Sequence, residues 1–109
     1  MSPLVLLVTR KIVKQEKFTA FLKPLDEAEK ERIELVLLEL ANNPDKAKPM
    51  PRHPECRVYG FVRGKKISKA PINLHNPSPE VSWVFHEFWL FFRLEDDDII
   101  FWHGYRIGA

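Results

Sequence analysis

The sequence predicts one α+β domain in two layers, a helical hairpin packed on a mainly antiparallel sheet. A chain of 109 residues is long enough to bury a single core and short for two. The spacing of apolar residues is helical in the first half and alternates in the second, which is the order expected for helices followed by strands. Eleven of the thirteen aromatic residues follow residue 58, so the sheet should hold the denser part of the core. We therefore treat residues 1–109 as one domain.

The chain is expected to open with a strand over Leu4–Val13, an apolar and partly β-branched run. Phe18, Phe21 and Leu22 then have helical spacing on a short polar segment. This helix should stop before Pro24, because the residue that precedes a proline avoids the α region. A short first helix therefore follows the strand.

The second helix has the clearest sequence signals. Asp26 followed by Glu29 is typical of a capping box. A buried stripe is then predicted on one face at Ile33, Val36, Leu37, Leu40 and Ala41. Neither helix would persist alone in water, so the stripe predicts a sheet beneath it.

Residues 42–56 carry four prolines and predict a stiff connector with no regular element. Two strand-like runs come next, over residues 56–64 and 65–76, with the expected turn at Arg63 and Gly64. The segment "NPSP" predicts a second turn.

Residues 81–94 are apolar at both odd and even positions, which predicts a central strand that is covered on both faces. The acidic run "EDDD" should turn the chain into an antiparallel strand over Ile99–Tyr105. Simple alternation gives one face of this last strand Ile99, Phe101, His103 and Tyr105, and the other face Ile100, Trp102 and Arg106. His103 and Tyr105 can then act together, whereas Arg106 must reach round the strand end, which needs a bend at Gly104.

Charge, cysteine content and hydropathy bound the function. The net charge of +2 permits a nucleic-acid partner. A middle stretch is almost wholly basic, with Arg52, Arg57, Arg63, Lys65, Lys66 and Lys69.

Cys56 is the single cysteine, so no intramolecular disulfide can form and we expect an intracellular protein and no catalytic thiol. The run "PLVLLV" is too short to span a membrane and lacks the features of a signal peptide, so we expect a cytoplasmic protein. The four histidines lack the short spacing of zinc motifs, so no metal is expected.

Three segments resemble the RelE/ParE toxin superfamily, especially its HigB-like branch. They are "LDEAEKERIELVLLELANNPDKAKPM", the strand entry "PEC", and "FWLFFRLEDDDIIFWHGYR". The resemblance implies a RelE-like fold and the toxin of a toxin–antitoxin pair, an mRNA interferase that cuts mRNA on the ribosome. Such an endoribonuclease uses no metal or other cofactor, and a cognate antitoxin protein holds it inactive.

The resemblance also assigns roles to residues. Arg106 matches the basic residue after the last strand, His103 the imidazole of a His-Gly pair, and Tyr105 the neighbouring aromatic. Arg57 or Arg63 would supply a positive charge on the second strand. In the catalytic set His103, Tyr105, Arg106 and Arg63, the two arginines stabilise phosphate charge, His103 is general acid or base, and Tyr105 orients or stacks a base. Trp89 stands where the family signature has an arginine.

Each candidate residue also has an ordinary structural interpretation. His103 could be a hydrogen-bonded histidine at the core margin, Tyr105 an edge aromatic, and Arg106 a surface charge. For His86 we favour a satisfied His–Glu pair over a site, and His53 and His75 lie in loops. Arg57, Lys65, Lys66 and Lys69 suit contact with an RNA backbone or a solvated hairpin tip equally well.

Two alternative functions stay open beside the ribonuclease. One is a non-catalytic binding module for a protein or single-stranded nucleic acid, and the other is a ParE-like gyrase inhibitor on the same scaffold. Leu35 and Leu38 lie off the main stripe of the second helix, where a homodimer or an antitoxin segment could cover them.

Overall fold

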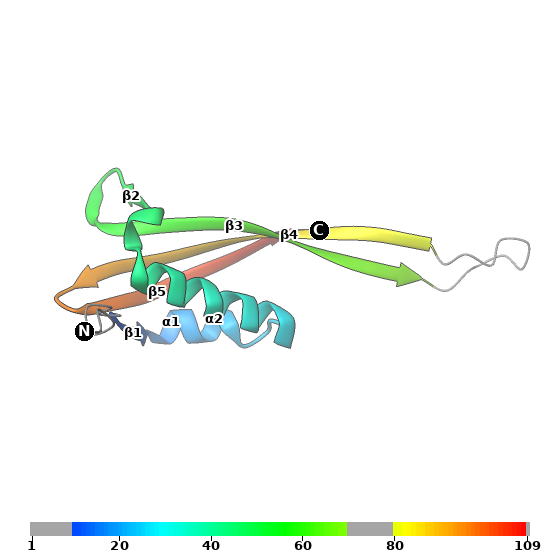
Figure 1. The fold of residues 1–109 in the computed structure, drawn as a ribbon, viewed down its shortest axis with the longest axis horizontal. Helices are drawn as coiled ribbons and strands as arrows, with labels where there is room; N and C mark the ends of the chain where they lie inside the picture. The colour runs from blue at the N-terminus through cyan, green and yellow to red at the C-terminus, as the bar shows by residue number, and fades with distance from the viewer. Residues whose placement is uncertain (1–9, 70–79, 109) are drawn as a thin grey trace, which may run out of the picture.

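The computed structural model describes residues 10–69 and 80–108, with every side chain in these ranges except those of 65–69 and 80–82. Figure 1 shows two α-helices beside a long sheet in this part of the chain. The elements are β1 (Lys11–Lys14), α1 (Glu16–Leu22), α2 (Glu27–Asn42), the 3-10 helix η2 (Pro44–Lys46), β2 (Lys48–Met50), β3 (His53–Lys69), β4 (Glu80–Glu95) and β5 (Asp98–Gly108).

The five strands form one sheet in the order β1-β5-β4-β3-β2. β1 pairs with β5 in parallel, whereas the other three pairings are antiparallel. The predicted fold class, with its mainly antiparallel RelE-like sheet, is therefore wrong, because the sheet is mixed. Nearly the whole chain separates β1 from β5, so no local turn in the sequence signals the direction in which they meet. Their register is fixed where the Lys11 amide donates to the Asp97 carbonyl at 3.1 Å and the Gln15 amide donates to the Phe101 carbonyl at 3.0 Å.

The helices cover one face of the sheet, which we call the helix face. The stripe predicted for the second helix is confirmed, since Ile33, Val36, Leu37, Leu40 and Ala41 are all buried. They pack with Phe18 of α1 and with Phe88, Leu90, Phe92, Ile99 and Phe101 of the sheet. The capping box is present as well: Asp26 accepts from the Glu29 amide at 2.8 Å, and Glu29 accepts from the Asp26 amide at 3.2 Å.

Several strand boundaries differ from the predicted ones. β1 is confined to Lys11–Lys14, and residues 4–9 of the expected first strand lie outside the described residues. The expected connector over 42–56 contains η2, β2 and the start of β3. The predicted turn at Arg63 and Gly64 is wrong, because β3 runs unbroken through both residues. The second predicted turn, at "NPSP", also lies outside the described residues.

The predicted hairpin at the acidic run is confirmed. β4 and β5 pair antiparallel around a turn at Asp96 and Asp97. Asp96 has a φ of 53°, in the left-handed region, which aspartate tolerates better than most residues. The Arg10 side chain also binds the Asp96 carbonyl at 3.0 Å.

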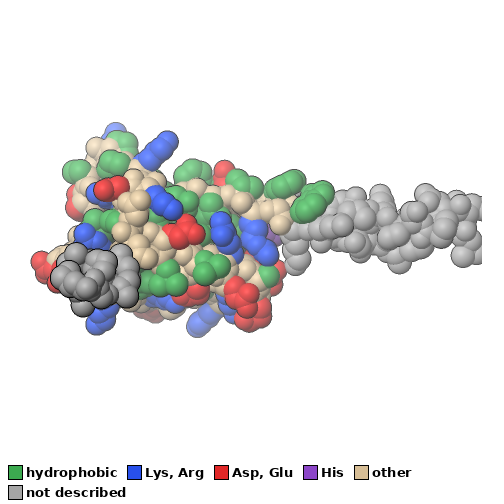
Figure 2. All heavy atoms as spheres, in the orientation of Figure 1, with side chains coloured by type: hydrophobic (Ala, Val, Ile, Leu, Met, Phe, Trp, Pro, Cys, Tyr) green, Lys and Arg blue, Asp and Glu red, His purple; other side chains and the backbone are tan. Residues whose placement is uncertain are grey.

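The second face of the sheet has no helix layer among the described residues, so the prediction that β4 is covered on both faces is wrong. Trp83 and Phe85 are 59% and 58% exposed, whereas Phe88 and Leu90 on the helix face are fully buried. We call this side the open face; it includes Val58, Gly60, Val62, Trp83, Phe85, Glu87, Trp89, Phe91, Arg93, Glu95, His103, Tyr105 and Ile107. β3 and β4 continue past the helices as a two-stranded arm, which consists of residues 64–69 of β3 and 80–85 of β4 (Figure 1). Figure 2 shows hydrophobic side chains at the surface beside this arm.

Candidate functional site

A bulge at Trp102 sets the faces on which the candidate residues lie. Phe101 pairs with Phe92 and His103 pairs with Phe91, so Trp102 is an extra residue in β5. One extra residue reverses the alternation that follows it. His103 and Tyr105 therefore lie on the open face with Phe91, opposite to the face that holds Phe101. The predicted grouping of Ile99 and Phe101 with His103 and Tyr105 is wrong for this reason.

The structure brings His103 and Tyr105 together, as predicted. Their ring centroids are 4.3 Å apart and the planes meet at 75°, an edge-to-face contact. Phe91 packs against both, with centroid distances of 6.0 Å to His103 and 5.6 Å to Tyr105. Nδ1 of His103 is enclosed and has no hydrogen-bond partner in the described part of the chain. Proton exchange with a ligand would therefore use Nε2.

These two residues line a cleft between β5 and α1. β1 pairs with β5 only as far as Phe101, so the edge of β5 beyond that point is free and faces α1. The cleft measures about 600 Å³ and is lined by Lys17, Ala20, Phe21, Pro24, Leu25, His103, Gly104, Tyr105 and Arg106. Three of the four predicted catalytic residues thus share one cleft, and Lys17 adds a cation that sequence reasoning did not identify.

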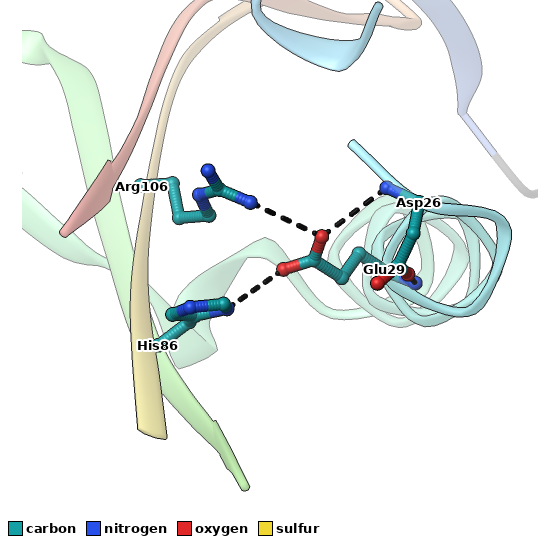
Figure 3. A network of polar contacts seen from close by, with 4 residues as sticks. All are labelled: Asp26, Glu29, His86 and Arg106. Carbon is teal, nitrogen blue, oxygen red and sulfur yellow. Dashed lines mark hydrogen bonds and ion pairs between the residues drawn. The ribbon is translucent and has the colours of Figure 1, made fainter. Parts of the chain in front are cut away.

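Arg106 reaches the cleft from the helix face. Its Nη1 lies 3.2 Å from Oε1 of Glu29, whose side chain is only 3% exposed (Figure 3). The Arg106 side chain is 40% exposed. A guanidinium has five N–H donors, so Arg106 can contact Glu29 and a ligand together.

Glu29 also fixes His86, on its second oxygen. Oε2 of Glu29 lies 3.0 Å from Nδ1 of His86 (Figure 3). The favoured interpretation of His86 as a satisfied His–Glu pair is thus confirmed, although its partner comes from α2. We call Glu29, His86 and Arg106 the Glu29 network.

Arg63 does not join the cleft. It lies directly across from His86 on the helix face, in β3, and β4 separates it from β5. The predicted catalytic set of four is therefore split. The turn expected at Arg63 would have freed its side chain, but the continuous strand fixes it on this face.

Arg57 also has a structural position, on the helix face of β3. Its Nη1 donates to Oδ1 of Asp45 at 2.9 Å and to the Pro44 carbonyl at 3.0 Å, which ties η2 to the sheet. The side chains of the other predicted RNA-binding residues, Lys65, Lys66 and Lys69, lie outside the described part of the structure, although their backbone belongs to β3.

Among the described residues, the remaining titratable candidates form no further site. His53 is 3.6 Å from Glu55 at the surface, and His75 lies outside the described residues. Burial, followed by the charge of Glu55, raises the pKa of the Cys56 thiol, which opposes thiolate formation. Within residues 10–69 and 80–108, no group of three potential metal ligands lies together.

A second cleft lies near the opposite edge of the sheet, beside β2, and was not foreseen. It measures about 230 Å³ and is lined by Lys46, Lys48, Val58, Tyr59, Gly60 and Trp89. Lys46 and Lys48 lie in the segment that we predicted to be a connector. The pattern of that segment does not indicate that the two lysines share a cleft with Trp89.

No protein-family model, curated protein or solved structure matches this chain. The helices of the described residues include none that is both long enough and apolar enough to cross a membrane.

Proposed function

We propose that this protein is the toxin of a toxin–antitoxin pair and a metal-independent endoribonuclease that cuts mRNA on the ribosome. It would act in the cytoplasm, where a cognate antitoxin protein holds it inactive. The resemblance of three sequence segments to RelE/ParE toxins suggests this activity. The observation that carries it is the cleft in which Lys17, His103, Tyr105 and Arg106 meet.

Each side chain of the cleft has a role in the proposed reaction. Nε2 of His103 takes the proton from a ribose 2′-hydroxyl, whose oxygen attacks the adjacent phosphorus. The bond to the 5′-oxygen of the next nucleotide breaks, which leaves a 2′,3′-cyclic phosphate, and the departing 5′-oxygen takes a proton from solvent water to become a hydroxyl. Lys17 and Arg106 stabilise the negative charge that develops on the phosphate.

Tyr105 completes the cleft as a platform for a base. It is 50% exposed, and its contact with His103 fixes the orientation of the imidazole. Because the Nδ1 atom of His103 has no hydrogen-bond partner within the described residues, the ring contacts with Tyr105, Phe91 and Trp102 are what position the general base.

Controlled expression in a bacterial host tests the proposal. We expect the wild type to arrest growth and to leave cuts within translated transcripts, detected by mapping transcript ends. His103→Ala should abolish both, and His53→Ala, a surface histidine far from the cleft in the sequence, should change neither. Growth without cuts in the wild type, or cuts that persist in His103→Ala, would reject the proposed site.

The open face favours a second candidate function, a non-catalytic binding module. Trp83 and Phe85 stack at 6.3 Å and are more than half exposed, which is typical of a recognition surface. If His103→Ala keeps full toxicity whereas Trp83→Ala abolishes it, binding would be the activity.

A further inference from the structure

Two neighbouring rows of side chains cross the open face and connect the two clefts. In the first row, Lys48 of β2 pairs with Val58, Val58 with Phe91, and Phe91 with His103. Residues paired in this way lie on the same face of a sheet. Lys48 and His103 are therefore the ends of one row that spans four strands, a distance of about 14 Å at the usual strand spacing.

The second row consists of Gly60, Trp89 and Tyr105. A Cβ atom at Gly60 would lie 2.6, 2.7 and 2.8 Å from three atoms of the six-membered ring of Trp89. Near-equal distances to three ring atoms mean that the indole lies flat over the glycine. The opposite side of the indole then points away from the sheet, and Trp89 is only partly buried. Trp89 and Tyr105 thus form two aromatic platforms side by side.

Positive charge lies at both ends of these rows. Lys48 is exposed and has no ion-pair partner within the described residues, and Lys46 beside it has a weak surface pair with Glu39 at 3.6 Å. Lys17 and Arg106 lie in the cleft at the other end. β4 places two acidic residues on the open face: Glu87 lies one row further along, opposite Ile107, and Glu95 lies beyond the other side of the rows, where it pairs with Arg93. The two rows themselves contain no carboxylate.

We infer that the two rows are the path of single-stranded RNA from the Lys46–Lys48 cleft to the catalytic cleft. This inference rests on the proposed ribonuclease function and adds the route by which an unpaired strand reaches the catalytic cleft. Exposed aromatic rings stack on bases, which only an unpaired strand presents, and lysines at the ends contact the phosphates. A duplex keeps its bases stacked inside and cannot use Trp89 and Tyr105 in this way.

Binding of an uncleavable oligonucleotide tests the path without any reaction. The probe is a fluorescein-labelled 2′-O-methyl hexaribonucleotide of mixed sequence, which lacks the 2′-hydroxyl that the proposed reaction needs. Fluorescence anisotropy should show that Trp89→Ala weakens binding about 5- to 150-fold, the range that loss of one base–aromatic stack produces. Trp89→Phe should bind within about threefold of the wild type, since it keeps a ring. Lys48→Ala should weaken binding and lower the salt dependence by about one charge.

Val62→Ala is the matched control, because Val62 is an exposed apolar residue of the open face that lies outside both rows. It should bind as the wild type does, and a duplex of the same sequence should bind far more weakly than the single strand. Circular dichroism and urea unfolding identify any variant that fails to fold; if Trp89→Ala does not fold, Lys48→Ala carries the test.

The proposed RNA path and the proposed ribonuclease activity can be rejected independently of each other. Binding that depends on Trp89 without any transcript cutting would support the path and reject the ribonuclease. Cutting in the host together with unchanged probe binding in Trp89→Ala and Lys48→Ala would reject the path alone. Absence of probe binding, equal affinity for the duplex, or a dimer that Trp89→Ala converts to a monomer would also overturn the path.

Discussion

Trp102 is an extra residue in β5, and it changes the face of the sheet on which the end of that strand places its side chains. Counting alternate residues along β5 predicts that His103 shares a face with Phe101, but the bulge moves it to the opposite face. Nothing in the local sequence marks Trp102 as the extra residue, because a β-bulge needs no glycine or proline. The residue types of the candidate site could therefore be chosen from the sequence, but the faces on which they lie could not.

The carboxylate of Glu29 holds the Glu29 network together, because it contacts both Arg106 and His86. Glu29→Ala would remove the acceptor for Arg106 and His86 and one half of the capping box. We expect the free energy of unfolding to fall by about 2–4 kcal/mol, because a buried carboxylate and its hydrogen bonds are lost together. Urea unfolding followed by circular dichroism measures this. Glu27→Ala is the control, since Glu27 is in the same helical turn but its side chain is 88% exposed. Equal losses for the two variants would contradict the structural role of Glu29.

Cys56 should react slowly for a surface cysteine. Its pKa is raised, mainly by burial and then by Glu55, so a smaller fraction is thiolate at neutral pH than in a free peptide. We expect alkylation by iodoacetamide at pH 7.5 to be slower in the folded protein than in urea, and its rate to keep rising above the usual pKa of a thiol. Mass spectrometry gives a direct readout, because the chain has one cysteine. A folded-state rate equal to the rate in urea would contradict this prediction.

At the scale of elements, the close approach of helix α1 to β5 depends on Gly104. A Cβ atom at Gly104 would lie 2.5 Å from Cδ2 and 2.6 Å from Cε2 of Phe21, so the ring occupies the space that any larger side chain would need. Phe21 also packs on Phe18, whose side chain is fully buried. The catalytic cleft lies along this contact, and its shape depends on how closely α1 approaches β5.

Gly104→Ala should therefore loosen α1. We expect a loss of about 1–3 kcal/mol in the free energy of unfolding, the usual cost of overpacking. Phe21→Leu, which removes the ring, should relieve part of this loss in the double variant. Urea unfolding of the two single variants and the double variant gives the coupling energy between the two sites. Additive effects would mean that the two residues do not contact each other.

Other elements show what sequence patterns can and cannot define. The capping box and the stripe of α2 were predictable, because both depend on residues three or four apart on one helix. β3 was divided wrongly, because Gly64 beside Arg63 was interpreted as a turn. In the structure, Gly64 instead makes room for a ring across the strand, since a Cβ there would lie 2.8 Å from Cε1 of Phe85. Such a packing role depends on β4, which lies far away in the sequence.

At the scale of the whole molecule, the sheet has a supported part and an unsupported part. β5 ends where Gly108 pairs with His86, so β4 residues before His86 pair only with β3. The helices also pack against the other end of β4, where Phe88, Leu90 and Phe92 are fully buried. Among the described residues, the arm thus has neither a third strand nor a helix layer, and an isolated pair of strands is marginally stable in water.

Native-state hydrogen exchange should reveal this division. The amides of Leu90 and Ile100 should exchange only through global unfolding, because they lie in the supported part with strands on both sides. Those of Val84 and Phe85 should exchange much faster, through local opening of the arm, although they belong to the same strand as Leu90. NMR or mass spectrometry after timed labelling measures the difference. Adding the single-stranded probe should leave the fast amides of the arm unchanged, because the proposed RNA path crosses the sheet at Phe91 and Trp89. Equal protection along the whole of β4 would instead mean that the arm folds as one cooperative unit with the core.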